Sequence, residues 1–139
     1  MFPNRRTVRI EWGDCDPADI VWYPRYFGFF DASTQYLFEA VGYKKYEMIR
    51  QFGLVGYPLL ETKAKFMIPS RYGEDIVIES TISEFGRSSF VVNHRVLKGE
   101  AVAIEVSETR VLVRKDPDTG KMKSCPVPEE IIKAFKEKA

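Results

Sequence analysis

The sequence contains few cysteines, one histidine and almost no excess charge. Two cysteines, Cys15 and Cys125, are too few for the disulfide framework of a small secreted domain. The 21 basic and 20 acidic residues leave a formal net charge of +1, so no overall positive field attracts nucleic acid. No run approaches the ~18 consecutive apolar residues of a membrane-spanning helix, and the N-terminus shows no secretory signal pattern. We expect a cytoplasmic protein without nucleic-acid or membrane partners.

The composition is that of an ordinary globular protein. Of the 139 residues, 45% are hydrophobic and 29% are charged, and no linker, repeat or low-complexity segment interrupts them. A chain of this length can bury a core without disulfide bonds. The sequence therefore predicts a single domain over residues 1–139.

The first half of the sequence is dominated by helical spacing. Apolar and charged residues alternate over 8–12, which predicts a strand, and Pro24 is well placed in the first turn of a helix over 25–41. That stretch is apolar along two stripes, which indicates a helix buried on most of its surface. A shorter helix follows over 44–52 and ends at Gly53.

The second half predicts strands and a terminal helix that begins at Pro128. The strands are expected at 59–68, 75–84, 89–97 and 101–115. The apolar phase of the last strand slips by one residue, which predicts a bulge near 107–110. Because short connections favour antiparallel pairing, we expect an α+β hotdog fold, in which a five-stranded antiparallel sheet wraps around the long helix.

The loop at 13–19 gathers three carboxylates, Asp14, Asp16 and Asp19. Considered alone, such a loop is most simply a turn whose acidic residues cap the following helix. A calcium loop would require acids at alternate positions, a central glycine and a distant glutamate, and Pro17 stiffens this segment. We therefore expect no metal site here.

The segment at 13–24, Gly-Asp-Cys-Asp-Pro-Ala-Asp-Ile-Val-Trp-Tyr-Pro, resembles the active-site segment of 4-hydroxybenzoyl-CoA thioesterases. A looser version occurs across bacterial acyl-CoA thioesterases of the same superfamily. Further matches at Tyr26, Asp31, 53–56 and 66–75 extend the resemblance over about residues 8–115. The resemblance implies a hotdog fold, a homodimer or homotetramer, and a site at the dimer interface that hydrolyses an acyl-CoA thioester. No cofactor is expected, because coenzyme A is part of the substrate.

The resemblance implies that Asp16 is the catalytic carboxylate. A carboxylate can attack the thioester carbonyl to form an anhydride, or it can activate water, and the sequence does not separate these routes. The first N–H groups of a helix lack intrahelical partners and can stabilise the developing oxyanion. Pro24 has no N–H, and the resemblance favours the backbone N–H of Tyr23.

Candidate substrate contacts also come from the resemblance. In the relatives, the aspartate at the position of Asp31 contacts the ring hydroxyl of an aromatic acyl group. Tyr57 stands where these relatives have a small hydroxyl residue, so a short- or medium-chain acyl group stays an alternative. Trp22 and Tyr26 are expected to contact the substrate as well.

The phosphates of coenzyme A require basic or hydrogen-bonding partners. The relatives use a basic cluster between the third and fourth strands, where this sequence has Arg87, Ser88 and Ser89. Only Arg87 keeps the positive charge. We expect these residues to bind coenzyme A.

Two other functions are compatible with the same fold. One is a non-catalytic module that binds acyl-CoA or an acyl carrier, and Asp16 discriminates it from an enzyme. The other is a hotdog dehydratase with His94 as its base, although an apolar-phase strand position is more typical of a core histidine. Cys15 is expected to be a packing residue, because it has no nearby base in the sequence.

Overall fold

The computed structural model describes residues 1–138, so Ala139, the end of the expected domain, lies outside the described residues. The strands are β1 (Asn4–Arg9), β2 (Leu59–Phe66), β3 (Asp75–Phe85), β4 (Ser89–Lys98), β5 (Ala101–Val111), β6 (Val113–Lys115) and β7 (Met122–Ser124). The helices are α1 (Pro24–Ala40), α2 (Lys45–Phe52) and α3 (Glu129–Lys138), with a short 3-10 helix η1 (Trp12–Asp14). Within residues 1–138, no helix is long and apolar enough to cross a membrane.

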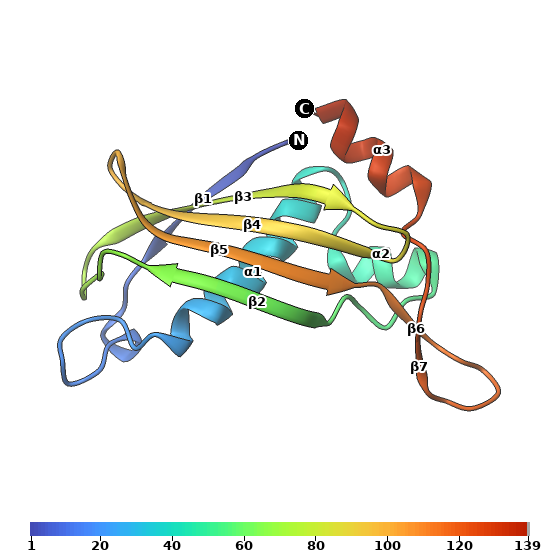
Figure 1. Cartoon of the computed structure of the whole chain (residues 1–139), viewed down its shortest axis with the longest axis horizontal. Coiled ribbons are helices and arrows are strands. Elements are labelled where there is room, and N and C mark those ends of the chain that lie inside the picture. The colour runs from blue at the N-terminus through green and yellow to red at the C-terminus, as the bar shows by residue number, and fades with distance from the viewer. Residues whose placement is uncertain (139) are drawn as a thin grey trace.

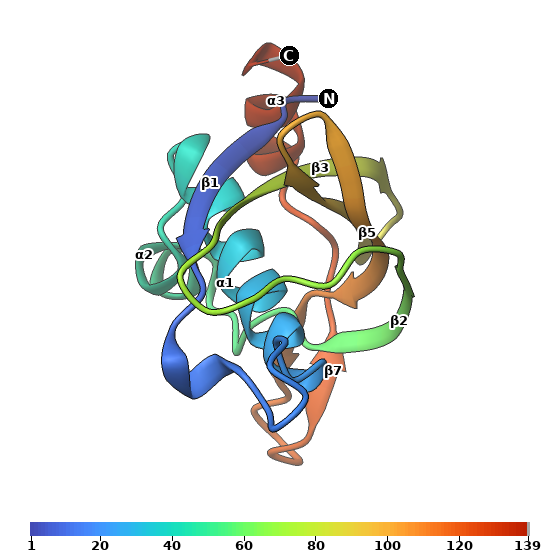
Figure 2. The ribbon, with the colours of Figure 1, turned by 90° about the vertical axis from the view of Figure 1, so that its left-hand side faces the viewer.

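Five antiparallel strands form one sheet in the order β1-β3-β4-β5-β2. On β3, side chains alternate between the two faces, and Ile76, Ile78 and Ile82 point inward and are fully buried. The sheet curls around α1, as Figures 1 and 2 show from two directions. This arrangement confirms the expected α+β hotdog fold, with α2 as the short second helix and α3 at the C-terminus.

The buried stripe of α1 is single, and this differs from the two stripes expected. Its members follow a spacing of three and four residues: Tyr26, Phe30, Ser33, Thr34, Leu37 and Phe38. Four of the 17 residues of α1 are exposed: Arg25, Gly28, Tyr36 and Glu39. The helix is therefore at least partly buried on most of its surface in a single chain, as expected.

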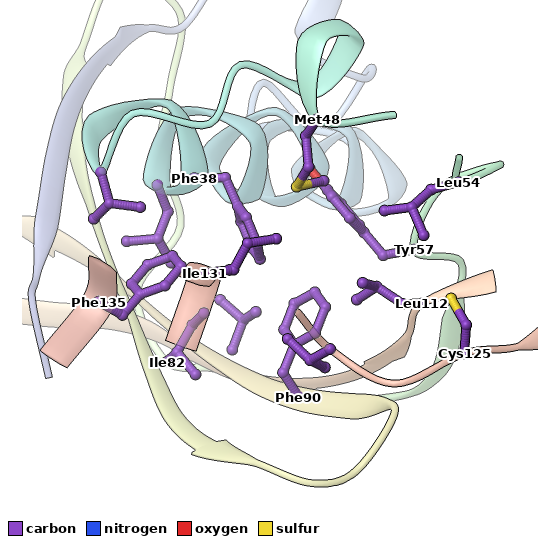
Figure 3. Close-up of a cluster of buried hydrophobic side chains, with 14 residues drawn as sticks. Phe38, Met48, Leu54, Tyr57, Ile82, Phe90, Leu112, Cys125, Ile131 and Phe135 are labelled. Carbon is purple, nitrogen blue, oxygen red and sulfur yellow. The ribbon is translucent and has the colours of Figure 1, made fainter. Parts of the chain in front are cut away.

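The core has two parts along α1. One lies under the first half of the helix and includes Ile10 and Phe30. The other lies under the second half, where α2 and α3 close the end of the sheet around Phe38, Phe90 and Phe135 (Figure 3). Aromatic rings fill this second part by edge and tilted contacts, such as the 5.1 Å between the ring centroids of Phe38 and Phe135.

Two strand predictions are corrected by the pairing. β1 ends at Arg9, and Trp12, expected in this strand, lies in η1. The bulge predicted near 107–110 is not in β5 itself, because that part of β5 pairs with β4 without interruption. A register shift does lie opposite it on β2, where Leu59 and Glu61 pair with the adjacent residues Arg110 and Thr109. A second shift lies beside Ala103, where both Ala103 and Ile104 are buried. The inward phase continues from Ile104 through two charged residues, Glu108 and Arg110, which sequence analysis did not place in the core.

Candidate active site

The loop that carries Asp16 is a tight turn. Cys15 and Val21 form an isolated antiparallel bridge, and the N–H of Asp16 donates to the carbonyl of Ile20 at 3.0 Å. The N–H of Asp19 donates to the carbonyl of Asp16 at 2.9 Å, and Asp19 adopts a left-handed backbone with φ of 68°. Aspartate tolerates this conformation better than most residues do. The backbone therefore holds Asp16 in a fixed place.

The three carboxylates of the loop have different surroundings. Asp14 accepts the N–H of Glu11 at 2.8 Å and lies 3.4 Å from Arg25 Nε, so it joins η1 to α1. Asp19 lies 3.5 Å from Arg71 on the exposed surface. Asp16 accepts the N–H of Ala18 at 2.8 Å, and no cation of residues 1–138 pairs with it. Asp16 is thus the carboxylate that remains available for chemistry.

Asp16 lies in a small surface depression, the Asp16 hollow. Its volume is about 290 Å³, and the rings of Trp12 and Tyr72 line it with Cys15. These two rings meet edge to face with centroids 5.4 Å apart. The hollow therefore offers an apolar wall beside a carboxylate.

The start of α1 offers one unused amide donor. The N–H of Trp22 donates to the carbonyl of Asp14 at 2.9 Å. The N–H groups of Arg25 and Tyr26 donate to the carbonyls of Trp22 and Tyr23 at 2.8 and 3.1 Å. The N–H of Tyr23 has no acceptor within residues 1–138. Because the helix dipole concentrates positive charge at this end, the Tyr23 amide can stabilise an anionic oxygen.

Tyr23 lines a second depression, the Tyr23 hollow, together with Tyr26 and Phe66. Its volume is about 330 Å³ and its walls are mainly apolar. Cys15 lines the Asp16 hollow and its bridge partner Val21 lines the Tyr23 hollow, so the two are neighbours at one end of α1. The single chain does not place the Asp16 carboxylate and the Tyr23 amide in one cavity.

The two other aromatic candidates at this end differ in burial. Trp22 is 51% exposed and lines neither hollow. Tyr26 is buried, and its ring packs between Phe29 and Phe66. Burial raises the pKa of the Tyr26 phenol, more than the nearby Ser70 lowers it. Tyr26 is therefore neutral at ordinary pH, and it lines the Tyr23 hollow.

Asp31 and Tyr57 line a larger cavity, the Asp31 cavity, of about 440 Å³. The Asp31 side chain is half-exposed, and its Oδ1 lies 3.0 Å from Arg110 Nη2. The Tyr57 ring stacks on Phe38 with centroids 5.2 Å apart, and Lys45 Nζ lies 4.5 Å from the ring centre. Burial raises the pKa of the Tyr57 phenol well above its usual range, more than the Arg110 guanidinium lowers it. Tyr57 therefore lines the cavity as a neutral phenol.

A row of buried polar side chains leads inward from Asp31, and two of its members that sequence analysis missed, Arg110 and Glu108, also line the Asp31 cavity. Arg110 Nη2 donates to Glu108 Oε2 at 3.0 Å, and Glu108 Oε1 lies 2.6 Å from His94 Nε2. Ser80 Oγ and His94 Nδ1 are hydrogen bonded at 2.7 Å. Burial disfavours ionisation of Glu108, but His94 and Arg110 outweigh it and lower the pKa of Glu108. The sequence contained a sign of this row. Glu108 and Arg110 lie an even number of residues after Ile104, so the alternation places them on the same inward face of the strand.

His94 is the core histidine that its strand position predicts. Its side chain has no exposed surface, and its ring stacks on Phe30 with centroids 5.1 Å apart. A side chain without exposed surface argues against His94 as a dehydratase base. In residues 1–138, no three histidine, cysteine or acidic side chains gather in a way that could hold a metal ion.

The residues expected to bind coenzyme A lie far from Asp16. Arg87, Ser88 and Ser89 lie at the turn where β3 passes to β4, at the opposite end of β3 from the Asp16 loop (Figure 1). The 11 residues of β3 span ~36 Å at about 3.3 Å per residue. The turn is anchored through its backbone, since the carbonyl of Ser88 accepts the N–H of Leu112 at 2.8 Å. One chain does not bring Arg87 and Asp16 together.

Several known proteins are similar to this chain in sequence and fold. The sequence pattern of the family described as the thioesterase-like superfamily matches residues 10–135. A 4-hydroxybenzoyl-CoA thioesterase from Pseudomonas sp. (strain CBS-3) is 33% identical over 130 residues, which cover 89% of this chain and 91% of the relative. The solved structure of a 4-hydroxybenzoyl-CoA thioesterase from that strain has a TM-score of 0.86 and 32% identity, covering 95% of this chain and 98% of that one. A solved gentisyl-coenzyme A thioesterase has a TM-score of 0.82 and 26% identity, covering 96% and 99%.

Proposed function

The chain belongs to the thioesterase-like superfamily, and on this premise we propose that it hydrolyses a hydroxylated aromatic acyl-CoA with Asp16 as its catalytic carboxylate. That it is a thioester hydrolase follows from its relatives, which carry this activity in their names. The observation that supports the finer proposal is that two free groups lie in neighbouring hollows at one end of α1. These groups are the Asp16 carboxylate, which no cation of residues 1–138 neutralises, and the Tyr23 N–H, which has no acceptor there.

The chemistry follows from these two groups. The Tyr23 N–H donates a hydrogen bond to the thioester oxygen as negative charge develops on it, and one such donor stabilises a transition state by about 3 kcal/mol. The Asp16 carboxylate either attacks the carbonyl carbon or removes a proton from the attacking water. The thiolate of coenzyme A leaves in both routes. In the first, water then hydrolyses the anhydride, which releases the free acid and restores Asp16. In the second, the attacking water gives the free acid directly. Neither route requires a metal or another cofactor, so we expect full turnover in their absence.

Two copies of the chain are needed to complete the site. Asp16 and Arg87 lie at opposite ends of β3, so they can bind one substrate only if they come from different copies. β2 is an edge strand whose residues are almost all exposed, and Phe66 at its end is 44% exposed. Exposed edges of this kind favour pairing with another strand. These features support a homodimer, or a homotetramer built from dimers, with the acyl-CoA site between copies.

The acyl group is assigned from Asp31. Its carboxylate lines a cavity of about 440 Å³, large enough for a benzoyl ring, and offers an acceptor to a ring hydroxyl. Two similar proteins are named for 4-hydroxybenzoyl and gentisyl groups, which are both hydroxylated benzoyl groups. A short- or medium-chain acyl group is the second candidate, favoured by Tyr57, whose ring forms part of the cavity wall.

The role of Asp16 is tested by two matched substitutions in the same loop. Asp16→Asn is expected to reduce kcat by about a hundredfold or more, because amide nitrogen and oxygen neither attack nor accept a proton as a carboxylate does. Asp19→Asn removes an exposed carboxylate three residues away, and asparagine tolerates its left-handed backbone, so it should keep wild-type activity. Activity is measured as thiol release. Binding is measured as the affinity of Asp16→Asn for acyl-CoA, which we expect to be retained.

Three outcomes separate the possible functions. Loss of turnover with retained binding in Asp16→Asn supports the catalytic carboxylate. Wild-type turnover in Asp16→Asn would assign the chemistry to another residue. An absence of turnover in the wild-type protein, across aromatic and aliphatic acyl-CoAs that it binds, would identify a non-catalytic binding module instead.

A further inference from the structure

Four charged or polar side chains form a continuous row from the Asp31 cavity into the core. Asp31 Oδ1 lies 3.0 Å from Arg110 Nη2, Arg110 Nη2 lies 3.0 Å from Glu108 Oε2, and Glu108 Oε1 lies 2.6 Å from His94 Nε2. The exposed fraction of these side chains falls from 50% at Asp31 to 6%, 2% and 0%. Asp31 is therefore the most exposed member of the row, and Arg110 and Glu108 form part of the cavity wall beside it.

The fold by itself does not require this row. Glu108 and Arg110 occupy inward positions of β5 that continue the phase of Ile104 and Val106, where apolar side chains would pack. Removing two charges from water is costly, and apolar residues of similar size are often as stable or more stable. The buried pair of Glu108 and Arg110 reaches the wall of the Asp31 cavity, which indicates a function in that cavity.

Arg110 is held in one orientation by its partners. Its Nη1 donates to the carbonyl of Tyr57 at 3.2 Å, and its Nη2 donates to Glu108. The guanidinium carbon lies 5.7 Å from the centre of the Tyr57 ring. The planar guanidinium is thereby fixed before it meets Asp31.

Asp31 depends on Arg110 for its position. Its Oδ1 lies 3.0 Å from Arg110 Nη2, and its Oδ2 accepts no hydrogen bond from residues 1–138. A helix side chain that is half-exposed would otherwise sample several rotamers. The contact with Arg110 selects one of them, and it leaves Oδ2 as an acceptor in the cavity.

We propose that Arg110 is a positioning residue that sets acyl specificity, because it fixes Asp31 with one carboxylate oxygen free to accept a hydrogen bond from the acyl group. Glu108 and His94 act one step further back, by holding Arg110. The substrate class that this favours carries a hydrogen-bond donor, such as a hydroxyl group, on the part of the acyl group that reaches Asp31. The inference rests on the proposed function, since it takes the Asp31 cavity as the acyl site.

The test measures specificity rather than activity alone. The ratio of kcat/KM for 4-hydroxybenzoyl-CoA to that for benzoyl-CoA is determined in wild type and in Arg110→Met. We expect this ratio to fall about tenfold or more, the effect of losing a hydrogen bond to a charged group. The loss should come from a higher KM for the hydroxylated substrate, with kcat for benzoyl-CoA retained. Arg95→Met is the control, because Arg95 also pairs with a carboxylate, Glu79 at 3.3 Å, but belongs to the outer face of β4.

Two further variants make the test independent of folding defects. Arg110→Met leaves Glu108 buried without its cation, so the double variant Glu108→Leu, Arg110→Met removes both charges and should fold. It should lose the same specificity as Arg110→Met. Asp31→Ala should lower the ratio by a similar factor, and adding Arg110→Met to Asp31→Ala should lower it no further, because both act through one contact.

The outcomes distinguish this inference from the proposed function. A wild-type preference for the hydroxylated substrate that survives in a folded Arg110 variant overturns the role of Arg110 and leaves the proposed substrate class intact. Additive effects of Asp31→Ala and Arg110→Met also overturn it. A wild-type enzyme without any preference for the hydroxylated substrate overturns the proposed acyl class and this inference together.

Discussion

At the residue scale, Glu108 is an acidic residue that stays ionised although it is buried. It is almost fully buried, yet its pKa lies below the ordinary value of 4.5, because His94 and Arg110 favour the charged form more than burial disfavours it. A carboxyl group whose pKa is lower in the folded state stabilises the fold above its unfolded pKa. This contribution is lost as the pH falls through the folded pKa.

The replacement Glu108→Gln tests this linkage. At pH 7 it should lower the free energy of unfolding by about 3 kcal/mol, since it leaves Arg110 and His94 without a buried partner charge. The difference from wild type should shrink as the pH falls from 5 to 3, because wild-type Glu108 then becomes protonated too. Urea unfolding at a series of pH values measures both quantities.

A matched control for Glu108 is Glu100→Gln, at an exposed position in the turn between β4 and β5. It should follow the wild-type pH dependence. Glu74 and Asp75, whose pKa values are also lowered, are unchanged in both variants and cancel in the comparison. A destabilisation by Glu108→Gln that stays constant from pH 7 to pH 3 would show that Glu108 contributes no charge to the fold.

At the scale of the element, the start of α1 decides where an oxyanion can bind. The residues around it use their N–H groups in local turns, and the Tyr23 amide is left over within residues 1–138. Pro24 at the first helical position makes this arrangement possible, because it needs no acceptor of its own. The start of α1 therefore offers one free N–H group, that of Tyr23, to an oxyanion.

Tyr23→Pro removes that donor with little change in the backbone. Tyr23 has φ of −52°, close to the value that proline imposes. We expect kcat to fall about a hundredfold or more, which is the usual cost of losing one oxyanion donor. Tyr23→Ala removes the same ring but keeps the N–H, so it is the reference for the proline variant. Equal kcat values in the two variants, both folded by thermal unfolding, would exclude the Tyr23 amide as the oxyanion donor.

At the scale of the whole molecule, the distance between Asp16 and Arg87 determines how many chains make a site. The two residues are separated by the length of β3, so the proposed site takes Asp16 from one copy and Arg87 from the other. In a dimer with two such sites, a mixed dimer of Asp16→Asn and Arg87→Ala chains contains one site with both wild-type residues.

Co-expression of these two variants should therefore restore activity. With random pairing, half of the dimers are mixed and one site in each is intact, so about a quarter of wild-type activity is expected at low substrate concentration. The control replaces the Arg87→Ala chain by a chain with both substitutions, which can build no intact site. Activity no higher than the mean of the two separate variants would place both residues in a site within one copy.

Local patterns in the sequence determined most of the fold. Alternation and helical spacing located α1, α2 and the main strands, because both periods follow from backbone geometry over a few residues. The loop with Asp16 and the helix start at Tyr23 were also predicted, since their residues are neighbours in the chain. The errors at β1 and near 107–110 have different causes. Trp12 continues the apolar alternation, but it lies in η1 after β1 has ended. In β5, the charged residues Glu108 and Arg110 occupy the inward face, so the apolar pattern indicated a change of phase that the strand does not make.

The sequence by itself thus determined the fold class, the order of its elements and the loop that presents Asp16, because these depend on contacts between near neighbours. The tertiary structure alone decided that Asp31 on α1 meets Arg110 on β5, that Glu108 joins Arg110 to His94 on β4, and that Arg87 lies a strand's length from Asp16. These relations join segments dozens of residues apart. They depend on which face of each strand is buried against the helix, and on the direction in which each strand crosses it.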